Sequence, residues 1–309
     1  MQTCINQVHF DVNSQHGSQN MNKPLSIEHA QNLGIKGSAK VFLGSVASLA
    51  FPRQTSLLLK EPKSSPSTLV DKLVMSYLKQ RAFQSRDSQF FERLHTDFWQ
   101  GEGGSVFSAN CDHRFNDLFL GKQKVDFLAL KDAWNNFEGN QIVEFGCNSG
   151  LVLDYLTKNL GNVESAVGID INQQQIDENV FSKELDSRIL FECVDGGDWL
   201  IDNGKPNTLF VTNGGVLEYF RRERLNEMMR HISNQLQPSI FFAIEPVAAD
   251  HDWATTKESI PFGKELSFSH NYTDLFESNG FEVIHQRATV FESWTMMATI
   301  AKTTHSKGS

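Results

Sequence analysis

The sequence is poor in cysteine and in basic charge. Its four cysteines are widely spaced among 309 residues and form no C-x-x-C pair. We therefore expect neither a disulfide framework nor a structural zinc site. We expect a reducing, cytoplasmic location. The chain carries 28 Lys and Arg against 37 Asp and Glu, a formal net charge of −9. This balance disfavours broad binding to nucleic acids or to anionic lipid surfaces.

Long apolar runs are also missing. The stretch 41–51, VFLGSVASLAF, is interrupted by serines and too short to cross a bilayer. The first residues lack the basic and apolar parts of a secretory signal. Hydrophobic residues nevertheless make up 39% of the chain and include 24 Phe. We therefore expect a soluble globular protein with a substantial core and no membrane partner.

Three zones of different composition follow one another. Residues 1–68 are rich in Asn, Gln and Ser and end in EPKSSPST, which predicts a loosely ordered arm and linker. Residues 69–138 carry apolar side chains at spacings of three and four, which predicts a helical cap. Within 139–303, short β-branched runs alternate with helix-length segments, typical of an α/β fold with a doubly wound, mostly parallel sheet of seven strands. The last two runs are too close for a helical crossover, so an antiparallel final strand is expected.

A turn of small residues follows the first of these strands, in the segment IVEFGCNSG at 142–150. Such a turn lets backbone N–H groups and the start of the next helix approach a ligand, which predicts a cofactor here. Asn148 stands where the middle glycine of such turns is usual, and Asn tolerates left-handed backbone angles. Taken alone, the turn is also compatible with an ordinary tight loop.

Two acidic residues strengthen the cofactor hypothesis. Asp170 ends the second strand, 20 residues after Gly150, where a doubly wound fold places the carboxylate that binds ribose hydroxyls. Asp195 ends the third strand, from which a side chain can reach a purine amino group. The plain alternative is that both are solvated loop acids.

Residues 139–302 resemble the class I S-adenosylmethionine-dependent methyltransferases, with EFGCNSG as a variant of their first motif. The resemblance implies a cofactor site with the methionine part at Glu144, Gly146, Cys147, Asn148 and Gly150, the ribose at Asp170 and Ile171, the adenine at Asp195 and Gly196, and the sulfonium beside Asn213 and Gly214. A nicotinamide-dependent oxidoreductase would share Asp170 but would not need Asp195, and the G-x-N-x-G spacing suits it poorly. A non-catalytic, cofactor-binding regulatory or scaffold subunit is the other alternative.

Methyl transfer from a sulfonium is an in-line displacement, which needs alignment, exclusion of water and, for a hydroxyl acceptor, a base. Loops at the ends of the fourth and fifth strands offer three candidates, namely His270, His251 and Glu245. The two histidines have usual pKa values nearest neutrality. Their plain alternatives are an exposed loop histidine and, for Glu245, a structural hydrogen bond. No metal-binding set is expected.

The acceptor side is predicted from two loops. Trp99, Phe107, Asn110 and Arg114 mix aromatic surface with polar groups and predict a lid, while Glu218 and Tyr219 follow the fourth strand. The alternative for the aromatic residues is simple packing of the helical zone onto the sheet. The sequence thus predicts methyl transfer to a small molecule, with oxygen slightly favoured over nitrogen and a role in specialised or sugar-related metabolism.

Overall fold

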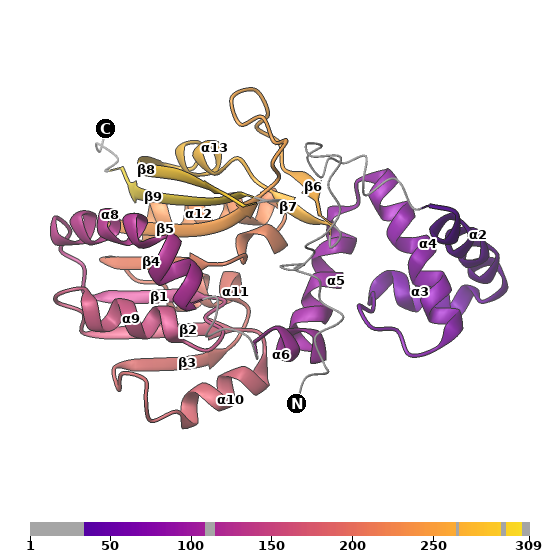
Figure 1. The fold of residues 1–309 in the computed structure, drawn as a ribbon, viewed down its shortest axis with the longest axis horizontal. Coiled ribbons are helices and arrows are strands. Elements are labelled where there is room, and N and C mark those ends of the chain that lie inside the picture. Colours follow the sequence, from indigo (N-terminus) through magenta and orange to yellow (C-terminus); the bar gives the residue numbers. More distant parts are fainter. Residues whose placement is uncertain (1–33, 109–114, 264–265, 292–294, 305–309) are drawn as a thin grey trace, which may run out of the picture.

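A seven-stranded sheet forms the centre of the fold (Figure 1). The computed structural model describes residues 34–108, 115–263, 266–291 and 295–304. The strands lie in the order β3-β2-β1-β4-β5-β9-β8, and β1 to β5 are mutually parallel. Their bounds are β1 Gln141–Phe145, β2 Ser165–Asp170, β3 Ile189–Cys193, β4 Thr208–Asn213, β5 Ser239–Val247, β8 Phe281–Val290 and β9 Thr295–Thr303. β9 runs antiparallel to both β5 and β8, so the predicted fold class and the predicted final strand are confirmed.

Helices cover both faces of the sheet because the strands are apolar on both sides. In β1, Val143 and Phe145 pack into one cluster with α11, α12 and α13, whereas Ile142 packs into the other with α8 and α9. Successive strand residues point to opposite faces, so one strand supplies both cores. The helices that cover the sheet or connect its strands are α8 Lys124–Asn135, α9 Leu151–Asn159, α10 Gln173–Phe181, α11 Gly196–Asn203, α12 Arg222–Gln235 and α13 Tyr272–Glu277.

Side-chain caps begin several helices directly after the strands. Asn172 accepts a hydrogen bond from the N–H of Gln175 and begins α10 two residues after β2. Asp195 accepts from the N–H groups of Gly197 and Asp198 and begins α11 two residues after β3. Each cap satisfies donors that would otherwise be unpaired. The loops at the carboxyl edge of the sheet are therefore short and fixed.

The zone 69–138 divides between two parts of the molecule, which differs from the single cap expected from the sequence. Of its first helices, α4 Leu69–Ser85 lies away from the sheet layers, whereas α5 Ser88–Gln100 and α6 Glu102–Ser108 lie at the carboxyl edge of the sheet (Figure 1). Phe119 of η1, Phe115–Lys122, and Phe127 of α8 are instead buried in a cluster with the sheet residue Ile142. The sheet domain therefore begins before residue 139, because these aromatic side chains complete one of its cores.

The arm expected over 1–68 contains two helices, α2 Gly34–Ala50 and α3 Pro52–Lys60. A Cβ at Gly44 would meet the backbone of Leu73, so the missing side chain lets α2 approach α4 closely. The small residues of this zone, which indicated loose order, thus allow close helix packing. α4, α5 and Leu58 of α3 share a core with Phe268. Residues 1–33 of the expected arm lie outside the described part.

Two further features complete the fold. A two-stranded hairpin, β6 Ile260–Phe262 and β7 Ser267–Ser269, was not expected from the sequence, and Phe268 of β7 joins the core of α4 and α5. Among the described helices, none combines the length and the apolar character that crossing a membrane requires.

Candidate active site

The turn between β1 and α9 has the backbone geometry that the sequence predicts. Gly146, Asn148 and Gly150 all have positive φ angles, of 65°, 46° and 73°. A Cβ at Gly146 would lie 2.6 Å from a methyl group of Val216, and one at Gly150 would lie 2.8 Å from the ring of Phe191. Glycine is required at both positions by angle and by space. Asn148 is the non-glycine residue that best tolerates the left-handed angle between them.

Asp170 ties the turn to the end of β2. One of its carboxylate oxygens accepts the N–H of Asn148 at 3.0 Å, and the other accepts the N–H of Asn172 at 2.9 Å. Burial raises the pKa of Asp170, and these N–H groups oppose that rise. A carboxylate can accept about four hydrogen bonds, so beyond the N–H groups of Asn148, Asn172 and Ile171 it retains capacity for a ligand hydroxyl. Ile171, the next residue, is half-buried.

Asp195 has more partners than the sequence predicted. Besides capping α11 with the same oxygen, it pairs with the guanidinium of Arg224, and its side chain remains 32% exposed. Gly196 is buried, and a Cβ there would lie 2.7 Å from the ring of Phe145. Arg224 comes from α12, 29 residues away, and no pattern in the sequence identifies it. Its proximity to Asp195 results from the packing of α11 against α12.

Glu245 fixes the loop that follows β4. The carboxylate is fully buried at the end of β5, and one oxygen accepts the N–H groups of Val216 and Leu217 at 2.8 and 3.0 Å. Burial raises its pKa to about 7. Gly214 and Gly215 in this loop have φ angles of 84° and 103°. The loop is thus bent sharply, and one carboxylate oxygen of Glu245 anchors two of its N–H groups.

His270 holds the same loop from the other side. Its Nε2–H donates to the carbonyl oxygen of Leu217 at 3.1 Å, and its Nδ1 lies 2.5 Å from the hydroxyl of Ser259. Burial, with Arg222 nearby, lowers its pKa to about 3. The ring is therefore neutral near pH 7, and both nitrogens have partners.

His251 lies in the adjacent loop after β5. Its Nδ1 is 2.8 Å from the hydroxyl of Ser269, which also accepts the N–H of Ala248. The side chain is 4% exposed, and burial lowers its pKa. The three residues predicted as bases thus lie near one another, and each forms contacts that hold a loop.

Aromatic residues of the expected lid meet above this edge of the sheet. Trp99 lies with ring centroids 5.0 Å from Phe107 and 5.3 Å from Tyr219, both edge to face. Tyr219 also packs against His95 at 5.1 Å. Glu218, beside Tyr219, is buried. Asn110 and Arg114, the other two predicted lid residues, lie outside the described part of the chain.

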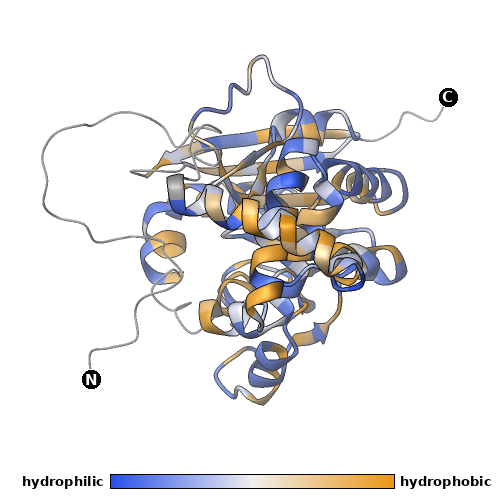
Figure 2. Ribbon diagram, turned by 90° about the vertical axis from the view of Figure 1, so that its right-hand side faces the viewer, coloured by the Kyte–Doolittle hydropathy of each residue, from blue (hydrophilic) through white to orange (hydrophobic). Residues whose placement is uncertain are grey.

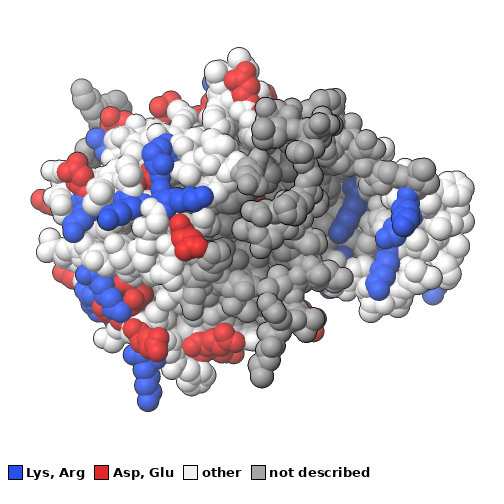
Figure 3. Space-filling view, viewed as in Figure 1, with Lys and Arg blue, Asp and Glu red and all other residues white. Residues whose placement is uncertain are grey.

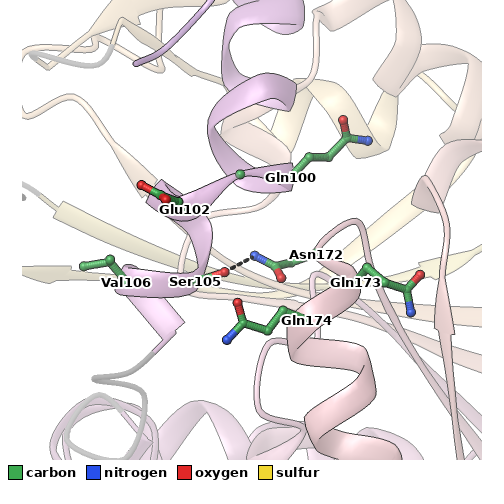
Figure 4. A pocket seen from close by; sticks show the side chains of 8 residues that line it. Gln100, Glu102, Ser105, Val106, Asn172, Gln173 and Gln174 are labelled. Carbon is green, nitrogen blue, oxygen red and sulfur yellow. Dashed lines mark hydrogen bonds between the residues drawn. The ribbon is translucent and has the colours of Figure 1, made fainter. Parts of the chain in front are cut away.

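Asn172 links the helical zone to the cofactor side. Its side-chain amide donates to the carbonyl of Trp99 at 3.1 Å and to the hydroxyl of Ser105 at 3.3 Å (Figure 4). A cavity of about 370 Å³ lies between α6 and the start of α10, with Gln173 and Glu102 on its walls. Asn172 was not among the predicted site residues, although an Asn immediately before a helical run is a recognisable helix cap.

A family model described as a methyltransferase domain matches residues 113–286, more than half of the chain. The chain belongs to this methyltransferase family. The predicted membership of the class I S-adenosylmethionine-dependent enzymes is thereby confirmed, and S-adenosylmethionine is its cofactor. No curated protein sequence matches the chain.

Solved methyltransferase structures resemble the fold at low sequence identity. Magnesium protoporphyrin IX methyltransferase from Synechocystis PCC 6803, crystallised with bound cofactor, is 15% identical, with a TM-score of 0.49, over 69% of this chain and 97% of that chain. The N-methyltransferase NodS from Bradyrhizobium japonicum WM9 is 12% identical, with a TM-score of 0.45, over 60% of this chain and 98% of that chain.

The described residues of the methyltransferase fit this cofactor. Three buried oxygens near the ends of β1 and β4, on Glu144, Asn148 and Asn213, have no hydrogen-bond partner among the described residues. Buried acceptors without donors are costly, and an ammonium group offers three donors. The amino-acid end of S-adenosylmethionine carries such a group. The surroundings of Gly214 also leave room for a ligand, because a Cβ built on this residue would meet no atom within 4 Å.

Proposed function

We propose that the protein transfers the methyl group of S-adenosylmethionine to an acidic oxygen, a carboxylate or a phenolate, of a small-molecule acceptor in specialised metabolism. The observation that carries this proposal is the direct connection between the glycine turn and Asp170, whose carboxylate accepts the N–H of Asn148. This connection sets the methionine site and the ribose site in one rigid frame. The cofactor supplies an electrophilic methyl group on its sulfonium.

Alignment in this proposal comes from the loop after β4. Glu245 accepts the N–H of Leu217, and His270 donates to the carbonyl of the same residue. One peptide segment is thus held from both sides beside Asn213 and Gly214. We assign Glu245 and His270 as positioning residues, which replaces the hypothesis that either is the base. Holding reactants in line contributes much of the rate enhancement in a displacement of this kind.

In this proposal, water is excluded from the site by three aromatic side chains above the loop, those of Trp99, Phe107 and Tyr219. His251, the third candidate base, is buried with a lowered pKa and is bonded to Ser269, so we assign no base among the three. An acceptor oxygen that ionises by itself needs no base. A carboxylate or a phenolate meets this condition, whereas an aliphatic sugar hydroxyl does not. We therefore favour an acidic oxygen acceptor over an amine.

Calorimetric titration of the full chain with S-adenosylmethionine, S-adenosylhomocysteine and nicotinamide nucleotides tests the cofactor assignment. Micromolar binding of the adenosyl compounds alone is expected. Nicotinamide binding would instead favour the oxidoreductase alternative. A second assay follows transfer of a radiolabelled methyl group to a panel of phenols, carboxylic acids, amines and sugars. Tight cofactor binding without transfer to any of these classes would favour the non-catalytic alternative.

A further inference from the structure

The lobe formed by α2, α3 and α4 differs in charge from the rest of the chain. Residues 34–86 contain nine Lys and Arg and only two acidic residues, a net charge of +7. The remaining residues contain 19 Lys and Arg and 35 Asp and Glu, a net charge of −16. On this lobe, at the right of Figure 3, the charged side chains in view are Lys and Arg. The acidic whole-chain balance therefore conceals a basic lobe.

The outer face of α2 is apolar. Phe42, Val46 and Leu49 follow one another at the helical spacing i, i+4, i+7 and are 67%, 51% and 83% exposed. Leu43 beside them is 52% exposed. Figure 2 turns this lobe toward the viewer and shows hydrophobic stretches along its helices.

The orientation of α2 is the reverse of that in an ordinary surface helix. Its inner face toward α4 is made of small residues such as Gly44 and Ala47, whereas its large apolar residues point outward. A surface helix normally buries its large apolar side chains. Contiguous exposed apolar residues on a soluble protein indicate an interaction surface.

Lys36 borders the apolar face, because it precedes Leu43 by seven positions on α2, whereas Lys40 shares the inner stripe of Ala47. Lys36, Lys40, Arg53 and Lys60 are exposed, and none of them forms an ion pair with another described residue. The segment 34–60 contains no acidic residue. Aromatic and aliphatic side chains bordered by lysines and arginines are the composition of helices that lie in the interface of an anionic bilayer. The lysine stems cover apolar surface while their ammonium groups remain in the headgroup region.

We propose that the outer face of α2, with the start of α3, binds the surface of an anionic lipid membrane. A second copy of the chain fits this face poorly, because pairing two copies through it would bring like charges together. A nucleic acid would engage the cations but would leave Phe42, Val46 and Leu49 exposed. The bilayer interface satisfies both the apolar and the charged residues. The inference does not depend on the acceptor proposed for the enzyme.

Flotation of the full chain with vesicles tests the proposal. Vesicles of phosphatidylcholine mixed with phosphatidylglycerol are expected to carry the protein at low salt and to release it at high salt, because salt screens the charges. Vesicles of phosphatidylcholine alone are expected to carry much less. A chain that floats with neither kind of vesicle overturns the proposal.

Substitutions of two kinds separate the apolar contribution to membrane binding from the electrostatic one. The double substitution Phe42→Ser with Leu49→Ser is expected to reduce partitioning about tenfold or more, because two apolar anchors are lost. Lys36→Gln and Arg53→Gln are expected to reduce binding to anionic vesicles about fivefold each. The matched control is Phe181→Ser, which removes an 81% exposed phenylalanine from α10 in the sheet domain and is expected to change nothing. Circular dichroism checks that each variant is folded.

The other occupants of the face give distinct results. A dimer in sedimentation velocity that the Phe42→Ser, Leu49→Ser variant converts to a monomer would assign the face to a second copy and overturn the proposal. Duplex DNA or RNA binding that depends on Lys36 and Arg53, together with vesicle binding unaffected by the apolar substitutions, would also overturn it. Loss of flotation in the apolar variant while cofactor binding is retained supports it.

Discussion

The cofactor side and the acceptor side of the site are built in different ways. On the cofactor side, Asp170 accepts main-chain N–H groups of Asn148 and Asn172, and the turn depends on backbone angles. On the acceptor side, side chains from distant elements meet, such as Trp99 of α5 and Tyr219 after β4. Contacts to the main chain demand particular residues at fixed spacings. Contacts between side chains depend on how whole elements pack.

Removing Asp170 gives the largest effect expected, because it breaks the main-chain frame itself. Asp170→Ala leaves the N–H groups of Asn148 and Asn172 without their acceptor and removes the carboxylate proposed to bind the ribose hydroxyls. Hydrogen bonds to charged groups contribute about 1.5 to 3 kcal/mol each, so affinity for S-adenosylmethionine should fall about 10²-fold. Isothermal titration calorimetry measures the change.

The control for this prediction is Asp177→Ala, which removes an exposed carboxylate from α10, the helix that follows Asp170. Its affinity for the cofactor should match that of the unchanged protein. An Asp170→Ala variant that is folded and binds as tightly as the control would remove Asp170 from the site.

The backbone of the proposed cofactor side could be predicted from the sequence for this physical reason. The alternation of strands and helices follows from apolar periodicity, and the turn follows from the residues that tolerate positive φ. Asp170 was found because a parallel sheet brings consecutive strand ends to one edge. Its partner Asn172 could have been found as a helix cap, since cap residues act within a few positions.

Glu245 and His270 extend the comparison, because they bind the N–H and the carbonyl of the same residue, Leu217, but their pKa values shift in opposite directions. Burial raises the pKa of Glu245 from the usual 4.5 to about 7, so between these values the folded state holds more protons than the unfolded chain. Its contribution to stability is therefore lost as pH rises from 4.5 to 7. Glu245→Gln should remove a slope of up to about 1.4 kcal/mol per pH unit from the free energy of unfolding.

For His270, stability changes with pH in the opposite direction. Its pKa falls from 6.5 to about 3, so the folded state holds fewer protons in that range and stability increases with pH. His270→Gln should flatten this increase. Urea unfolding at a series of pH values measures both slopes, with Glu138→Gln as an exposed control. Profiles for both buried variants that coincide with the control would contradict the assignment of these groups to the folded interior.

The aromatic lid tests the acceptor side alone. Trp99→Ala removes contacts with Phe107 and Tyr219 but leaves the carbonyl of residue 99 available to Asn172. Steady-state kinetics should show kcat/KM for the acceptor reduced about fivefold, with cofactor affinity nearly unchanged, because the lid excludes water without contacting the turn. Phe181→Ala, an exposed aromatic change, is the control. Equal losses in cofactor and acceptor binding would show that the two sides are not separate.

The sequence could not predict the contacts of the acceptor side. His270 was a candidate base from its position in a loop, yet packing gives both ring nitrogens partners. The contact of Tyr219 with His95 joins residues more than a hundred positions apart. No local spacing encodes such a contact, because it depends on the docking of α5 over the sheet. α2 and α3 were missed likewise, since small polar residues indicate a linker until the partner helix is known.

Arg224 lies where the two sides meet and gives the smallest effect expected. Its guanidinium pairs with Asp195 on the cofactor side and lies 3.8 Å from the carboxylate of Glu92 on α5, to which Arg221 also binds at 2.6 Å. The pairs are partly exposed, and such ion pairs contribute about 0.2 to 1 kcal/mol. Arg224→Met should therefore weaken cofactor binding only about threefold, and less at high salt. Because Asp195 keeps its backbone donors from α11, its carboxylate stays in place without the arginine. A loss as large as that of Asp170→Ala would mean that a side-chain network, rather than the main chain, holds the adenine end.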